Sequence, residues 1–199
     1  MRIEIRNDSV ILDGYVNAVE RESKPIPSVR GLFIEKIKAG AFQRSLDKNP
    51  NVDLLLNHNS NKRLGSIEQG NLKLFEDNIG LRAICTVFDG DVIEKAKNNQ
   101  LRGWSFGFFS KKDNWQLREN QHDIRTVEEL DLFEVTIVDN TRTPAYIATS
   151  IEMRDDKEVL KENRTNDFKA IVIDGSQEKR IENIDYSKFE KEIENFKKS

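Results

Sequence analysis

Leu-Arg-Gly-Trp-Ser-Phe-Gly-Phe-Phe-Ser occupies residues 101–110, and the rest of the chain is organised around it. Its aromatic residues are typical of a buried strand. Ser105, however, stands between two glycines, and glycines let a partner backbone or a substrate approach closely because they carry no Cβ. A serine in such a place is a candidate nucleophile, and a nucleophile needs a base. The sequence offers two histidines for that role, His58 and His122.

Composition and charge limit what the chain can be. Its 199 residues give room for one domain with a sizeable core and an appendage. The net charge of −3 argues against a nucleic-acid-binding protein, which usually carries a basic face. Cys85 is the only cysteine and lies in a strand-like run, so we expect a buried thiol in a reducing cytoplasm and no disulfide. No apolar run is long enough to span a membrane. We expect neither a metal nor a cofactor.

Upstream of the serine stretch, the hydrophobic periodicity predicts mainly strands. His58 follows the apolar run 52–56 in a polar loop, and the end of a strand is where a rigid scaffold often presents functional side chains. A second loop is expected at 21–31, which contains two prolines and a glycine. The expected strands are 2–6, 10–19, 32–35, 52–56, 72–75 and 80–87, and the expected helices are 41–46 and 91–97.

Downstream, residues 132–138 alternate as a strand does. Phe133 and the residues at 135 and 137 make the better core face, so Glu134 is expected on the opposite face. The composition then changes near residue 150. Of the last 49 residues 24 are charged, against 43 of the first 150, so we predict a folded domain at 1–150 and a charged, partly disordered tail at 151–199.

Two kinds of chemistry fit the serine. Residues 103–107 satisfy G-x-S-x-G, the nucleophile elbow of α/β-hydrolases. That motif needs a strand, a sharp turn and a helix, whereas residues 106–110 continue as a strand. The other possibility keeps a histidine, a serine and an acid in that chain order, which is acceptable because triads are defined by geometry and not by order.

Four segments together resemble the tailed-phage prohead maturation proteases. They occur in the family's order and cover roughly residues 10 to 150. They are Arg30–Leu46 with its Glu and Gly-Ala-Phe, Leu56-Asn-His-Asn59 followed by Leu64-Gly65, Trp104-Ser-Phe-Gly-Phe108, and Leu132–Val138 with Pro144-Ala145.

The resemblance implies a serine endopeptidase with an α+β, mainly β fold: a bent antiparallel β-barrel with surrounding helices, as in the herpesvirus capsid-maturation protease. Such proteases cleave the scaffold or the scaffold-like segment of the phage major capsid protein, and themselves. They act inside the assembling procapsid in the host cytoplasm, and the herpesvirus relatives are homodimers. By the same resemblance, Ser105 matches the nucleophile and His58 the general base, and Glu134 is the candidate for the third member.

The third member has alternatives in the sequence. The herpesvirus relatives use a second histidine, so His122 is an alternative, and Asp131 is a weaker one. Each residue also has a purely structural interpretation. Glu134 fits the solvent-facing position of a half-buried strand. Ser105 fits a hydrogen-bonded residue that fills space in a strand, and His58 fits a polar turn. By resemblance, the loop around Arg142 is a candidate for the oxyanion donors. A different class of function, a non-enzymatic capsid-assembly or scaffolding factor, also fits the charged tail.

Overall fold

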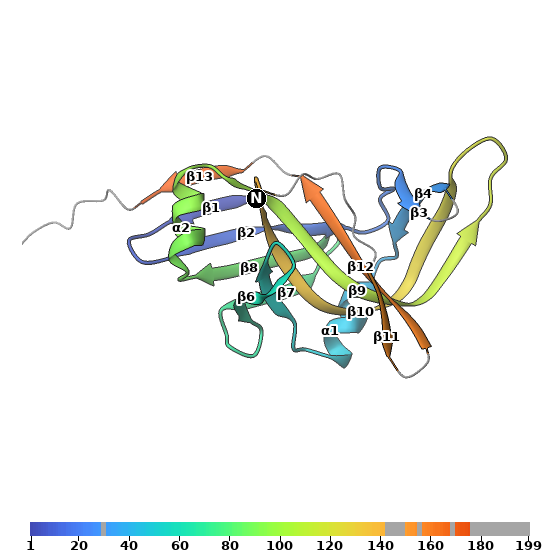
Figure 1. Cartoon of the computed structure of the whole chain (residues 1–199), viewed down its shortest axis with the longest axis horizontal. Helices are drawn as coiled ribbons and strands as arrows, with labels where there is room; N and C mark the ends of the chain where they lie inside the picture. Colours follow the sequence, from blue (N-terminus) through green and yellow to red (C-terminus); the bar gives the residue numbers. More distant parts are fainter. Residues whose placement is uncertain (29–30, 142–149, 155–156, 168–169, 176–199) are drawn as a thin grey trace, which may run out of the picture.

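The structure is a computed structural model, and it describes residues 1–28, 31–141, 150–154, 157–167 and 170–175. Most of these residues form strands, and two short helices lie beside them (Figure 1). The strands are β1 (Arg2–Ile5), β2 (Val10–Ala18), β3 (Ile26–Ser28), β4 (Gly31–Ile37), β5 (Asp53–Leu56), β6 (Asn59–Ser66), β7 (Leu72–Glu76), β8 (Gly80–Val87), β9 (Leu101–Gln116), β10 (Asp123–Asp139), β11 (Ser150–Arg154), β12 (Lys157–Asp167) and β13 (Ile171–Asp174), and the helices are α1 (Ala41–Lys48) and α2 (Gly90–Lys97).

The strands make two sheets. One has the order β13-β1-β2-β8-β7, and the other has the order β11-β12-β9-β10-β4-β3, with β5 also pairing β10 and β6 pairing β5. The mainly β prediction is therefore confirmed, as are both helices and the hairpin of β1 with β2. Neither sheet closes into a barrel within the part of the chain that the structure describes, so the bent barrel stays a prediction.

The long hairpin of β9 and β10 forms the centre of the second sheet. Its outer end, with the connecting turn, projects beyond β3 and β4 (Figure 1). Trp104, Phe106 and Phe108 of β9 are completely buried. Phe106 meets the ring of Phe42 from α1 edge-on at 5.4 Å, a favourable aromatic geometry. The aromatic run thus fills the space between the sheets, and it fixes the strand that carries Ser105.

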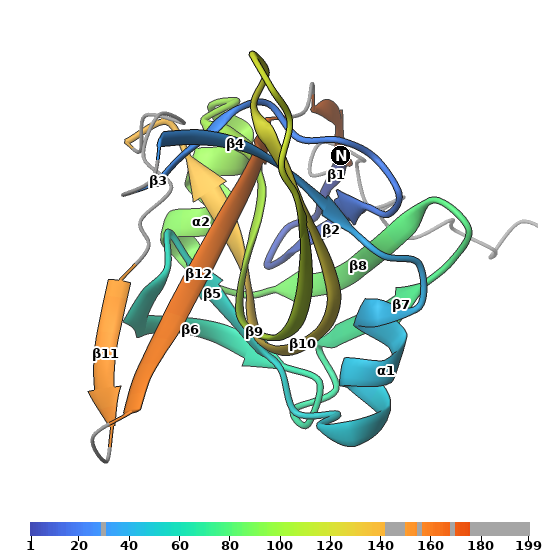
Figure 2. The ribbon, with the colours of Figure 1, turned by 90° about the vertical axis from the view of Figure 1, so that its right-hand side faces the viewer.

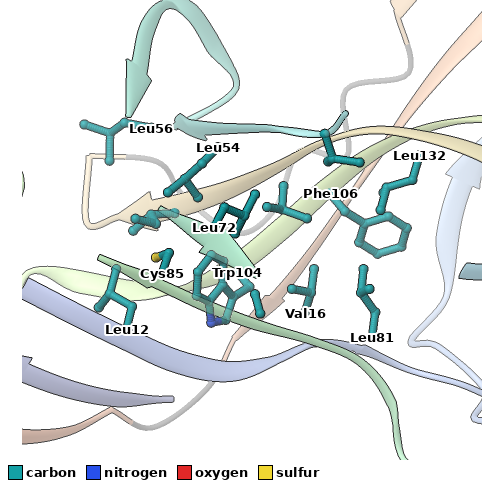
Figure 3. Close-up of a cluster of buried hydrophobic side chains, with 14 of the residues drawn as sticks. Leu12, Val16, Leu54, Leu56, Leu72, Leu81, Cys85, Trp104, Phe106 and Leu132 are labelled. Atoms are coloured by element: carbon teal, nitrogen blue, oxygen red, sulfur yellow. The ribbon is translucent and has the colours of Figure 1, made fainter. Parts of the chain in front are cut away.

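Both faces of β9 and β10 are covered in the region of the serine. Figure 3 shows Trp104 and Phe106 among side chains from several other strands, including Leu12, Leu54 and Leu81. Cys85 also lies in this core, and burial raises its pKa to about 12. The expectation of a buried thiol is confirmed by this position.

Several details differ from the sequence-based expectations. Residues 57–62, expected as a loop, are a tight turn followed by β6, and the loop expected at 21–31 contains β3. The register of β10 against β9 shifts between Leu132 and Glu134, so that Leu132 joins the core and Phe133 is only half-buried. A bulge of this kind inserts a residue and reverses the alternation. The predicted core face therefore holds for residues 135 and 137 and is wrong for Phe133.

Among the described residues, three strands lie at or beyond residue 150. β12 pairs with β9 and β13 pairs with β1, so these segments join the sheets formed by the first 150 residues (Figure 2). β13 coincides with an apolar island in the charged region. The division into a domain and a tail near residue 150 stays a prediction, and the residues after 175 lie outside the described part of the chain.

Candidate active site

A two-residue turn between β5 and β6 presents His58. Asn57 and His58 have φ values of 55° and 58°, the left-handed conformation that tight hairpin turns require. The turn is fastened to β10, because the backbone N–H of His58 donates to Thr136 Oγ1 at 3.0 Å and that of Asn57 donates to the Ile137 carbonyl at 2.9 Å. Left-handed backbone is uncommon for residues other than glycine, and it often marks a functional position.

Ser105 lies opposite Thr136 in the pairing of β9 with β10, and it therefore sits under the imidazole of His58. The Nε2 atom of His58 is 2.7 Å from Ser105 Oγ, within hydrogen-bond range. The three elements that meet here come from three separate parts of the sequence: the β5–β6 turn, β9 and β10.

Glu134 completes a continuous chain of contacts. Its Oε1 atom lies 2.5 Å from His58 Nδ1, and its side chain is only 5% exposed. A carboxylate at Nδ1 holds the proton on that nitrogen, which leaves the lone pair of Nε2 facing the serine hydroxyl. The prediction that Glu134 lies on the opposite face from residues 135 and 137 agrees with this position, whereas a solvent-facing Glu134 is excluded by its burial.

Gly107 makes room for this carboxylate. It pairs with Glu134, and a Cβ on Gly107 would lie 2.8 Å from Glu134 Cγ and 2.6 Å from Phe133 Cζ. Contacts below 3.0 Å force a neighbour to move. We expected this glycine to let a substrate approach Ser105. In the structure, the missing Cβ leaves space for the side chain of Glu134.

The alternative third members lie elsewhere. Asp131 is partly exposed and forms an ion pair with Lys111 at 2.8 Å. His122 lies in the turn that joins β9 to β10, where its carbonyl accepts from Arg118 Nε, and it lines a surface hollow with Arg118 and Glu22. Neither residue lines the hollow beside His58. Arg142 lies outside the described residues.

The contacts that β12 makes with Ser105 could not be predicted from the sequence. The hydroxyl of Ser105 is 2.6 Å from the carbonyl oxygen of Arg164, and the hydroxyl of Thr165 donates to Ser105 Oγ at 3.0 Å. Residues 164 and 165 belong to the charged region that we expected to form a tail. The burial of charged residues in that region would have been the only signal, and a single sequence does not show it.

A buried ion cluster fixes β12 close to the site. It consists of Glu35 of β4, Arg125 of β10, and Glu162 and Arg164 of β12, all less than 10% exposed. Arg164 contacts both oxygens of Glu35 at 2.7 Å, and Arg125 Nη2 contacts Glu162 at 2.8 Å. Burial disfavours the ionised form of Glu162, but the hydrogen bond from Arg125 and the two guanidinium charges outweigh it and hold the pKa of Glu162 below its ordinary value.

A group of three or more metal-binding side chains is not found among the described residues. The same part of the chain contains no helix that is long and apolar enough to cross a membrane. At the site itself a serine hydroxyl, an imidazole and a carboxylate are in contact. That set is the one that serine hydrolases use for acyl transfer.

Comparison with known families agrees with this class. The family model of the caudovirus prohead serine protease matches residues 1–163, and the chain belongs to that family. The protein is thus a serine protease of phage prohead maturation. Searches of curated proteins and of solved structures each returned no match.

Proposed function

We propose that Ser105 is the nucleophile, His58 the general base and Glu134 the residue that orients the imidazole. The observation that carries the proposal is the unbroken path from Ser105 Oγ through both ring nitrogens of His58 to Glu134 Oε1, with distances of 2.7 Å and 2.5 Å. The 2.7 Å distance puts Ser105 Oγ in position to pass its proton to His58 Nε2, and the carboxylate at Nδ1 orients the imidazole for that transfer.

The mechanism follows from these positions. His58 Nε2 takes the hydroxyl proton as Ser105 Oγ attacks a peptide carbonyl carbon, and it then returns the proton to the leaving amine. Water then attacks the acyl carbon while His58 Nε2 takes a proton from it, and the imidazole returns that proton to Ser105 Oγ as the acid product leaves. Glu134 holds the Nδ1 proton and stabilises the imidazolium, and its burial strengthens that interaction by excluding water.

The proposed substrates are the scaffold or the scaffold-like segment of the phage major capsid protein, and the chain itself. These substrates, the action inside the procapsid in the host cytoplasm, a homodimer and the relation to the herpesvirus fold follow from the resemblance of the four segments. A purely structural assembly role is the alternative, and membership in a serine protease family argues against it.

The test is whether the chain shortens itself after it has been produced in a host without other phage proteins and purified. Intact-mass measurements should show that the wild-type chain shortens with time, while Ser105→Ala and His58→Ala stay at full length. Ser110→Ala is the matched control, because Ser110 lies on the same strand and its hydroxyl donates to Asp113 Oδ2 at 3.4 Å, away from His58 and Glu134. Shortening of Ser105→Ala at the wild-type rate would contradict the assignment.

A further inference from the structure

Ser105 is inaccessible in the structure as it stands. The residue has no exposed surface, whereas the side chain of His58 is 17% exposed. An open hollow of about 410 Å³ reaches His58, and its lining comes from the β5–β6 turn, the start of β6 and Thr141; Ser105 is not part of that lining. A peptide that enters the hollow meets the base and not the nucleophile.

The element that covers Ser105 is β12. Residues Lys161–Asp167 of β12 run antiparallel to Gly103–Phe109 of β9, with Thr165 opposite Ser105 (Figures 1 and 2). The carbonyl oxygen of Arg164 lies 2.6 Å from Ser105 Oγ. Since a carbonyl carbon is about 1.2 Å from its oxygen, a peptide group of the chain already occupies the space where a substrate peptide group has to be.

The same contact competes with the base for a proton. A serine hydroxyl has one hydrogen to donate, and here two acceptors lie within range: the Arg164 carbonyl and His58 Nε2. While the proton points to Arg164, the lone pair of His58 faces the serine oxygen without a hydrogen between them. Removal of the Arg164 carbonyl leaves His58 as the acceptor, which is the arrangement that activates the nucleophile.

We propose that peptide substrates bind as an extended strand along β9, in the place that β12 occupies, and that β12 is displaced before Ser105 reacts. This proposal rests on the function proposed above. The ligand class is an extended polypeptide, because departure of β12 leaves without partners those backbone N–H and C=O groups of 103–109 that face β12, while the opposite edge stays paired with β10. Adding a strand from another chain satisfies such an edge through main-chain hydrogen bonds.

The buried ion cluster determines which state is populated. Arg164 enters the cluster from β12, and its guanidinium contacts Glu35 through two nitrogens. Taking one partner out of a buried ion pair is costly, so β12 stays in place when no competing strand is present. When β12 does leave, Arg125 still pairs with Glu35 and with Asp113, so each of these remaining charges on β4, β9 and β10 keeps an ion-pair partner.

A disulfide that ties β12 to β9 tests the proposal in the full chain. Lys161 and Phe109 are cross-strand partners, and Asp131 is the partner of Phe109 on the other side, in β10. Phe109→Cys with Lys161→Cys prevents β12 from leaving, while Phe109→Cys with Asp131→Cys joins two strands that have no need to separate. The natural Cys85 is buried and does not interfere. Thiol titration verifies each disulfide.

The readout is the rate at which a fluorophosphonate probe modifies Ser105, identified by peptide mapping. We expect oxidation to slow the β9–β12 variant more than about tenfold, and reduction to restore it, because only the open fraction reacts. Oxidation of the β9–β10 variant leaves its rate unchanged. If Ser105 of the β9–β12 variant is labelled equally fast in the oxidised and reduced forms, the displacement of β12 is overturned, but the assignment of Ser105 as the nucleophile is not. Absence of Ser105 labelling in every reduced chain overturns the proposed function as well.

Hydrogen exchange of the wild-type chain supplies a test without substitutions. If β12 leaves β9, the amides of residues 161–167 exchange faster than those of residues 130–137 of β10, which lie on the other side of the same strand. Equal protection of the two sets of amides contradicts the displacement of β12.

Discussion

Glu134 and Glu35 are two carboxylates with the same burial and different partners. Each is 4% exposed and each lies on a strand of the same sheet. Glu134 faces an imidazole, a group that gains a charge when it takes up a proton, whereas Glu35 faces the permanent charges of Arg125 and Arg164. A carboxylate with a titratable partner can respond when charge develops on that partner. One held by two guanidinium groups can only fix structure.

The first way to test this difference is Glu134→Gln. The amide keeps the shape of the side chain, but it no longer stabilises the imidazolium or enforces the tautomer that faces Ser105. We expect the self-processing rate to fall by about 1,000-fold to 10,000-fold, as for comparable changes in serine proteases. Thermal unfolding should change little, because the amide oxygen of the new side chain can still accept a hydrogen bond from His58 Nδ1. Self-processing within a few-fold of the wild-type rate would remove Glu134 from the triad.

Glu35→Gln should lower the stability of the fold and should not slow the reaction of Ser105. It leaves two buried guanidinium groups with one carboxylate fewer, so we expect the free energy of unfolding to fall by about 3 kcal/mol. Because Arg164 is then held less firmly, fluorophosphonate should label Ser105 faster than in the wild-type chain. Urea unfolding and the labelling rate measure the two effects. A drop in labelling of the folded protein would show that the cluster supports the active state and does not restrain it.

Gly107→Ala tests whether the position of the Glu134 carboxylate matters. The new Cβ displaces Glu134 or Phe133, and a misplacement of about 1 Å can cost up to about 100-fold in rate. The labelling rate of Ser105 measures the loss. Gly90→Ala is the control, because nothing lies within 4 Å of a Cβ at that position. Similar labelling of the two variants would mean that Glu134 has more freedom than its contacts indicate.

Acid should weaken the ion cluster through Glu162. The pKa of this carboxyl is held below its ordinary value of 4.5, so its contribution to stability is complete above that value and is lost as the pH falls through the lowered pKa. Urea unfolding between about pH 6 and about pH 3 should therefore show a steeper loss for the wild-type chain than for Glu162→Gln. Parallel curves would mean that Glu162 does not contribute through its charge.

The smallest effect is expected for His122→Ala. His122 lies in the turn of the β9–β10 hairpin, and a different hollow from that of His58 includes it. Self-processing and Ser105 labelling should stay at wild-type rates. A large loss would revive the second-histidine arrangement of the herpesvirus relatives, in place of Glu134.

The comparison also shows what the sequence could reveal. Ser105 and His58 could be proposed from local patterns, a serine in an aromatic strand and a histidine after an apolar strand, and Glu134 could be proposed because its strand resembles the last of the four prohead-protease segments. The roles of Glu35 and Arg164 could not, because their pairing joins residues 129 positions apart. Charged residues at those positions are typical of solvent-exposed faces, and only tertiary packing buries them.

The bulge in β10 shows the same limit on a smaller scale. Alternation in residues 132–138 predicts one face for Phe133 and residues 135 and 137, and the inserted residue breaks that rule next to Glu134. Periodicity assumes regular pairing, and bulges are common next to active sites.

Fluorophosphonate labelling of the wild-type chain and of His58→Ala, with the modified residue located by peptide mapping, tests the central claim most directly. We predict a single adduct, on Ser105, that forms in the wild-type chain and is lost in His58→Ala. An adduct on another serine, or equal labelling of Ser105 in both chains, would contradict the account.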